Sequence, residues 1–200
     1  MFKQLMAATA IVGSVLAPAG LAGASEHRPL VQEIGIGLVY ETFDETDNQM
    51  LFVGGSVGEF CEDNPADPFN AEPGSAMARV FVHRDGAVTV KATNQEQPAY
   101  LYRTGAAGGP PWIEAVCADM ANGAEPPEAF ATGAVALKLR VTEHSPDLVD
   151  VFNSTRGTVT SADGSRFRVR SKADFILENG MPAGDPTDFV ELDVRPMCRR

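Results

Sequence analysis

The stretch Val80-Phe-Val-His-Arg-Asp-Gly-Ala-Val-Thr-Val90 predicts a β-hairpin and decides the fold class. If Arg84-Asp85-Gly86 forms a three-residue loop, Val82 faces Val88 across the two strands. A two-residue turn would instead place Val82 opposite Thr89. Because cross-strand partners share one face of a sheet, we predict the longer loop, with its glycine in the left-handed conformation.

A second hairpin between Gly157 and Arg170 follows the same logic. With Ala162-Asp163-Gly164 as its loop, Val159 faces Phe167, and the polar residues share the other face. A two-residue turn would oppose Val159 to Arg168, so we again predict the three-residue loop.

Further stretches have the composition or the period-two alternation of strands. Gly35 and Gly37 alternate with apolar residues in the first of them, which suggests that another element approaches that strand closely. The stretches are Ile34–Tyr40, Met50–Val53, Val135–Val141, Ala173–Leu177 and Val190–Val194.

One short helix is expected at about residues 111–121. Pro110 and Pro111 suit a first helical turn, an apolar stripe at i, i+3, i+4 and i+7 follows, and Gly123 ends it. The stripe consists of Ile113, Val116, Cys117 and Met120. Many strands and one helix predict a mainly β fold, an antiparallel β-sandwich or barrel.

The first residues have the pattern of a secretory signal peptide. Lys3 precedes an apolar run, Leu5–Leu16, and the small residues Ala22–Ala24 suit cleavage after residue 24. We therefore expect residues 1–24 to be a signal peptide and residues 25–200 a single β-rich domain, secreted or periplasmic. No later run approaches the ~20 apolar residues of a membrane span, and the arginine-rich, lysine-poor composition looks bacterial.

The negative net charge of the chain argues against some classes of binding partner. The full chain has a net charge of −11, and loss of Lys3 leaves 15 basic and 27 acidic residues, or −12. Such a charge repels nucleic acid and anionic lipid head groups. We expect no nucleic-acid partner.

The cysteines predict one structural disulfide. An exported chain meets an oxidising compartment, and Cys198 lies in a tail that we expect to fray. We therefore predict a Cys61–Cys117 bridge and leave open whether Cys198 is free or links two copies.

Gly54-Gly55-Ser56-Val57-Gly58 matches the G-x-S-x-G pattern of serine hydrolases. That elbow needs a helix after the serine, and Glu59–Pro65 is a poor helix former. An order Ser56, Asp119, His144 is available, but no pattern brings these residues together. We assign no catalytic residue.

No metal or cofactor site is assigned either. The histidines, His27, His83 and His144, are not clustered as zinc ligands are. Acidic loops near Asp47, Glu62 and Glu178 lack the spacing of an EF-hand, so turn formation explains them.

Two surface features stay open as binding elements. Arg166, Arg168 and Arg170 line one face of a strand, where they could bind an anion or remain a solvent face. Trp112, Tyr100 and Tyr102 could edge a pocket or pack in the core.

The sequence therefore predicts an exported, non-enzymatic β-domain that binds a small molecule or a surface partner. The alternatives are an exported serine- or metal-dependent hydrolase and a purely structural envelope role. The sequence does not identify the ligand or the partner.

Overall fold

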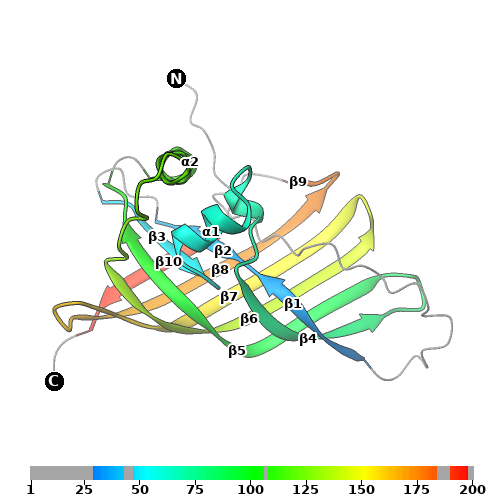
Figure 1. Cartoon of the computed structure of the whole chain (residues 1–200). Helices are drawn as coiled ribbons and strands as arrows, with labels where there is room; N and C mark the ends of the chain where they lie inside the picture. Colours follow the sequence, from blue (N-terminus) through cyan, green and yellow to red (C-terminus); the bar gives the residue numbers. More distant parts are fainter. Residues whose placement is uncertain (1–28, 43–46, 106–107, 184–189, 198–200) are drawn as a thin grey trace.

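A computed structural model describes residues 29–42, 47–105, 108–183 and 190–197. The fold is mainly β, an antiparallel sheet with two α-helices, as predicted from the alternation (Figure 1). The strands are β1 (Leu30–Ile36), β2 (Leu38–Glu41), β3 (Gln49–Val53), β4 (Gly74–Val82), β5 (Val88–Arg103), β6 (Ala131–Ser145), β7 (Leu148–Ser161), β8 (Arg166–Glu178), β9 (Met181–Pro182) and β10 (Val190–Pro196). The helices are α1 (Val57–Asp63), the short 3-10 helix η1 (Pro68–Asn70) and α2 (Pro110–Ala121).

The sheet is an antiparallel meander with a segment inserted near one edge. Its order is β1-β4-β5-β6-β7-β8-β10, and β3 pairs with both β2 and β5. β3 and β4 follow one another along the same side of β5, opposite residues 99–103 and 88–91. They form one interrupted strand, and residues 54–73 with α1 and η1 are the insertion between its halves.

Glycines at the root of this insertion allow backbones to approach closely. A Cβ on Gly37 would lie 1.8 Å from the carbonyl oxygen of Ala71, and one on Gly35 would overlap Glu72. Gly54 has φ +103 and lies against the backbone of Ile36. The predicted close approach at Gly35 and Gly37 is confirmed, and the approaching element is the end of the insertion.

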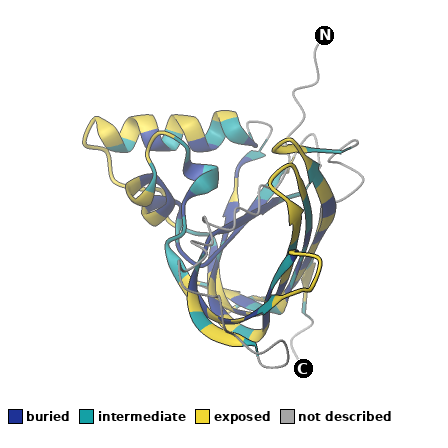
Figure 2. Cartoon of the chain, turned by 90° about the vertical axis from the view of Figure 1, so that its right-hand side faces the viewer, coloured by how far each residue is buried: buried dark blue, intermediate teal, exposed yellow. Residues whose placement is uncertain are grey.

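The strands curve so far that the two ends of the order approach each other. β10 lies against β2, and a view along the strands shows the sheet bent around an interior (Figure 2). This arrangement fits an open barrel or a β-sandwich, the two architectures that the sequence predicted.

Both predicted hairpin registers are confirmed. Val82 pairs with Val88 around a loop in which Gly86 has φ +90. In the second hairpin Val159 pairs with Phe167. Because alternate residues of a strand point to opposite faces, these two pairings determine which residues of β4, β5, β7 and β8 face the interior.

Apolar residues form two clusters, one on each side of the sheet. The inner cluster contains the alternating residues of β6, from Val135 to Val141, with inward residues of every neighbouring long strand. The outer cluster lies between the helices and the sheet, around Phe52 and Tyr102. The helices therefore cover the outside of β3 and the end of β5.

The structure corrects the expectation of a single helix. α2 confirms the predicted helix, but Glu59–Pro65, expected to be a poor helix former, is largely helical because α1 spans Val57–Asp63. Its first turn is stabilised by a capping box, in which Ser56 and Glu59 bond to each other's backbone N–H. Burial of Val57, Phe60 and Cys61 adds tertiary stabilisation.

The predicted Cys61–Cys117 disulfide is present and joins α1 to α2. Cys117 lies on the buried side of α2, as the apolar stripe indicated. The predicted signal peptide (residues 1–24), His27 and Cys198 lie outside the described residues.

Candidate functional site

Four buried polar side chains meet inside the curved sheet. Asn153 and Thr155 point inward from the middle of β7, and Ser171 points inward from β8, directly opposite Thr155. Tyr40 comes from β2, which reaches this position because the sheet curves until β2 and β10 meet. All four are 5% exposed or less. We call them the inner polar cluster.

The cluster is a chain of hydrogen bonds. The hydroxyls of Thr155 and Ser171 are 2.6 Å apart, and Ser171 is hydrogen-bonded to the Tyr40 hydroxyl. Tyr40 donates to Oδ1 of Asn153 at 2.5 Å. Burial raises the pKa of Tyr40 above its ordinary value, opposed by the bond from Ser171, so the phenol stays protonated and remains a donor.

The chain ends on an unpaired donor. Nδ2 of Asn153 is buried and has no hydrogen-bond partner within the described structure. A buried, unsatisfied polar group costs about 1–3 kcal/mol, and in native proteins such a group calls for an explanation. Hydrogen bonds in a chain polarise one another, so the bond accepted by Oδ1 makes the free N–H a better donor.

The surroundings of Asn153 are apolar and uncharged. Its neighbours across the sheet are Leu139 and Ala173. Apart from the tyrosines, the buried polar side chains among the described residues are those of Gln97, Thr104, Asn153, Thr155 and Ser171, and none carries a charge. A group that meets the free N–H would therefore be a neutral hydrogen-bond acceptor, since an anion would find no cation there.

One end of the interior is bordered by apolar side chains that water reaches. Leu30 and Val82 face inward at this end and are 38% and 47% exposed. Val149 and Leu177 are partly buried, pack against the inner cluster and oppose each other across β7 and β8. Val149 lies four residues before Asn153 on β7, about 13 Å along the strand. This apolar rim is thus separated from the unpaired amide by the buried Val151.

Glu41, at the end of β2, has the most perturbed carboxyl that the structure describes. It is half-buried and accepts a hydrogen bond from the backbone of Gly109, just before α2. Burial raises its pKa to about 7, and the Gly109 bond opposes that rise only in part. Glu41 is therefore a group that titrates near neutral pH at the junction of sheet and helix.

The serine pattern forms a helix cap. Ser56 follows β3 and precedes α1, but its backbone is extended (φ −75, ψ 164) and lacks the strained turn of a nucleophile elbow. Its hydroxyl accepts the backbone N–H of Glu59 at 3.3 Å. Asp119 is exposed on α2.

The described histidines lie away from Ser56. Val53, three residues before Ser56, pairs with Ala99 on β5, and Ala99 pairs with Gly133 on β6. His144 lies eleven residues beyond Gly133 on β6, about 36 Å along the strand. His144 pairs with Asp150 at 2.9 Å, and His83 bonds Thr89 at 2.9 Å. The structure therefore does not bring the formal triad together.

The acidic loop that follows Cys61 supports local turns. Asp63 accepts the backbone N–H of Glu72 at 2.6 Å, and Asn64 accepts that of Asp67 at 3.3 Å. Among the described residues, no group of three or more His, Cys, Asp or Glu side chains could hold a metal ion.

The aromatic residues pack in the outer cluster. Trp112 lies 5.6 Å from Tyr102 and 6.4 Å from Phe52, measured between ring centroids. The Tyr102 hydroxyl accepts the N–H of Val57 at 3.2 Å. These aromatics attach α1 and α2 to the sheet, and the packing interpretation applies.

The sequence analysis missed the inner polar cluster, although its signal was present. Once the second hairpin register is set, Thr155 and Ser171 fall on the inward, otherwise apolar, positions of β7 and β8. Asn153 has the same parity as the buried Val151 and Val159. A polar residue at an inward strand position is the pattern that could have identified the site.

Comparisons with family models, with curated proteins and with solved structures find no match. Across the described ranges, no helix has the length and hydropathy needed to span a membrane.

Proposed function

We propose that this protein binds a small, mainly apolar molecule inside its curved sheet. The observation that carries the proposal is the unpaired Nδ2 of Asn153, a buried donor in an apolar interior. Ligand sites of this kind combine apolar walls with a few placed polar groups, and the Asn153 amide, which accepts the Tyr40 hydroxyl at Oδ1, supplies such a group.

The chemistry of the cluster specifies the ligand class. The free N–H requires an acceptor, and the uncharged surroundings favour a neutral one such as a ketone, ester or amide carbonyl. The apolar rim at Leu30 and Val82 favours an apolar remainder. The expected export of the chain suits a carrier that shields such a molecule from water.

A neutral fluorescent ketone tests the proposal. Prodan (6-propionyl-2-dimethylaminonaphthalene) has an apolar ring system, one carbonyl acceptor and an emission that shifts to the blue on leaving water. We expect saturable one-to-one binding with a blue shift. Asn153→Leu keeps the side-chain shape and removes the donor, so it should weaken binding about fivefold, the value of one neutral hydrogen bond.

Thr155→Val is the matched control, because it removes a polar group from the same strand and leaves the Asn153 donor in place. We expect its affinity to stay within about twofold of the wild type. Far-UV circular dichroism verifies that both variants fold. Equal affinities for wild type and Asn153→Leu, or no saturable binding, would contradict the proposal.

A further inference from the structure

Basic side chains gather on the outer face of one wall of the sheet. Arg166, Arg168 and Arg170 alternate along β8 and point outward, as the sequence indicated. The registers place Arg156 opposite Arg170 and Arg195 opposite Arg168. We call this set the arginine face; its members are Arg156, Arg166, Arg168, Arg170, Lys172 and Arg195.

Most of these charges are not neutralised by neighbours. On the same face Asp174 pairs with Lys172 at 3.2 Å, and Asp193 pairs with Arg195 at 2.8 Å. Asp193 also faces Arg170 in the register, and Glu191 faces Lys172. Within the described residues, the structure shows no ion pair for Arg156, Arg166, Arg168 or Arg170.

The arrangement has a cost for the free protein. Arg156 and Arg170 are directly opposed, and like charges opposed across strands are destabilising. Arg170 also has Asp193 opposite it on β10, which offsets part of this cost. Arginine in particular binds phosphate oxygens in a bidentate manner.

The acidic charge of the chain lies elsewhere. Residues 54–73 and 108–129, which carry the helices, contain nine acidic residues and no Lys, Arg or His. The helices lie outside one wall (Figure 2), whereas β8 is three strands from β5 in the order. The acidic layer and the arginine face thus lie on different walls, so the charge at the outer face of β8 is locally basic although the chain as a whole is acidic.

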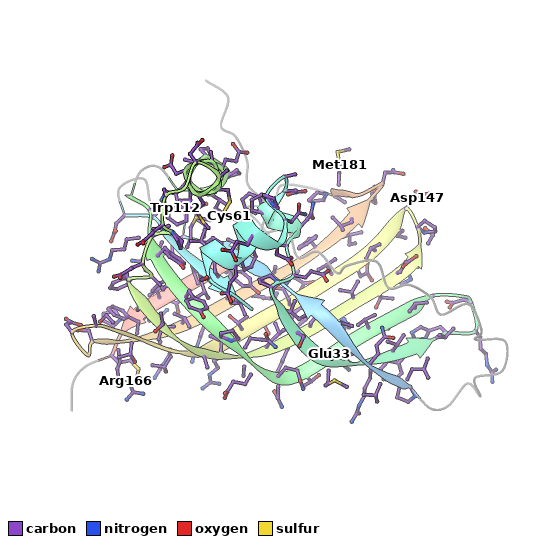
Figure 3. The ribbon with its side chains drawn as sticks, in the orientation of Figure 1. Glu33, Cys61, Trp112, Asp147, Arg166 and Met181 are labelled. Atoms are coloured by element: carbon purple, nitrogen blue, oxygen red, sulfur yellow. A yellow bond between two sulfur atoms is a disulfide. The ribbon has the colours of Figure 1, made fainter. Side chains whose placement is uncertain are left out.

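The outer face of β8 ends in apolar residues. Ile176 continues the outward row of β8 and is 43% exposed. Leu148 on β7 and Met181 on β9 both oppose Glu178, with exposures of 37% and 69%. Figure 3 labels the two ends of this region, Arg166 and Met181. The outward row of β8 thus runs from the arginines through the Lys172–Asp174 pair to Ile176 and Glu178. Basic residues and exposed apolar side chains on one face combine the two attractions of a lipid surface, phosphate headgroups and acyl chains.

We propose that the outer face of β8, with its neighbours on β7, β9 and β10, docks on an anionic phospholipid surface. The arginine face binds headgroup phosphates, and Ile176, Leu148 and Met181 contact the acyl boundary. The convex outer face of a curved sheet contacts a flat membrane along one strand direction, and the outward side chains of β8 lie along such a line. This surface is on the outside of the sheet, so the inference stands independently of ligand binding at Asn153.

Vesicle co-sedimentation tests the proposal with the full chain. We expect binding to vesicles of phosphatidylcholine with phosphatidylglycerol, weak binding to phosphatidylcholine alone, and release at about 1 M salt, where charges are screened within about 3 Å. Each basic residue near an anionic surface raises the membrane partition coefficient about fivefold. Arg168→Gln/Arg170→Gln should therefore reduce the partition coefficient about 30-fold.

Arg79→Gln/Lys91→Gln is the matched control, since it removes two exposed basic residues that pair across β4 and β5. It should change partitioning less than threefold, and thermal unfolding verifies that both double variants fold. Equal losses in both variants, or no binding to anionic vesicles, would overturn the proposal. It would also fail if inorganic polyphosphate bound as tightly as vesicles and Ile176→Ser left vesicle binding unchanged, because the partner would then be a soluble polyanion.

Discussion

The hydrogen bond between Tyr40 and Asn153 should show strong energetic coupling in a double-mutant cycle. Tyr40→Phe keeps the ring and removes the hydroxyl, so Oδ1 of Asn153 loses its donor at a position 1% exposed. Both amide atoms are then unpaired, at a cost of about 2 kcal/mol of unfolding free energy. Asn153→Leu removes the amide and leaves the Tyr40 hydroxyl without its acceptor, at a cost of about 1 kcal/mol.

The double variant should lose much less than the sum. With both partners replaced by apolar groups of similar shape, no unpaired amide remains, and such replacements are close to neutral. We expect a coupling of about 3 kcal/mol, far above the ~0.5 kcal/mol scatter of independent sites.

Urea unfolding measures these values, with the disulfide kept oxidised. Trp112 is the single tryptophan and reports on the helical layer, while far-UV circular dichroism reports on the sheet. Coincident transitions justify the two-state treatment. The part-buried hydroxyl pair Thr89 and Thr142, 3.1 Å apart, supplies a control cycle that should couple weakly when both residues are changed to Val. Additive losses for Tyr40 and Asn153 would refute the hydrogen-bond chain.

Three further perturbations follow from the described contacts. Glu41→Gln mimics the neutral acid, and because the folded pKa is raised to about 7, wild-type stability falls as pH rises from about 4.5 through 7. The unfolding free energy of the variant should match that of wild type at pH 5 and exceed it at pH 8 by about 1.5 kcal/mol, allowing for solvent screening. A gain in stability at pH 5 alone would contradict a raised pKa of Glu41. Cys61→Ser/Cys117→Ser opens a bridge between residues 56 apart and should cost about 4 kcal/mol in urea unfolding, and a loss below 1 kcal/mol would contradict the bridge. Ser56→Ala removes the cap of α1 and should cost about 1 kcal/mol, whereas an unchanged midpoint would deny that role.

Local patterns predicted the fold class because pairing parity is a local property. In the hairpin at Val82 and Val88, one choice of loop aligns apolar residues and the other does not, so the register follows from a few neighbouring residues. The helix at α2 and the position of Cys117 followed in the same way from a single apolar stripe.

Features that depend on distant segments were harder to predict. The interruption between β3 and β4 is visible only when residues 54–73 are seen to leave and rejoin the same side of β5. α1 was not predicted, because Glu59–Pro65 has the composition of a poor helix former, although Ser56 and Glu59 have capping-box spacing. This short helix is stabilised by the disulfide and by the packing of buried Phe60, and both contacts join it to distant parts of the chain.

The candidate site was only partly accessible from sequence. Thr155 and Ser171 could have been placed from the hairpin register, but Tyr40 lies 113 residues from Asn153 and joins the cluster through the curvature of the whole sheet. The residues with familiar patterns, such as Ser56, serve local structure. The arginine row on β8 was predicted from sequence, but the opposed Arg156 and the apolar end required the register.

Native mass spectrometry of the purified protein tests the central claim most directly. The account predicts a native mass above that of the polypeptide by one small neutral molecule, which denaturation releases and which Prodan displaces one for one. A bare polypeptide mass that stays unchanged after saturation with Prodan would contradict ligand binding inside the sheet.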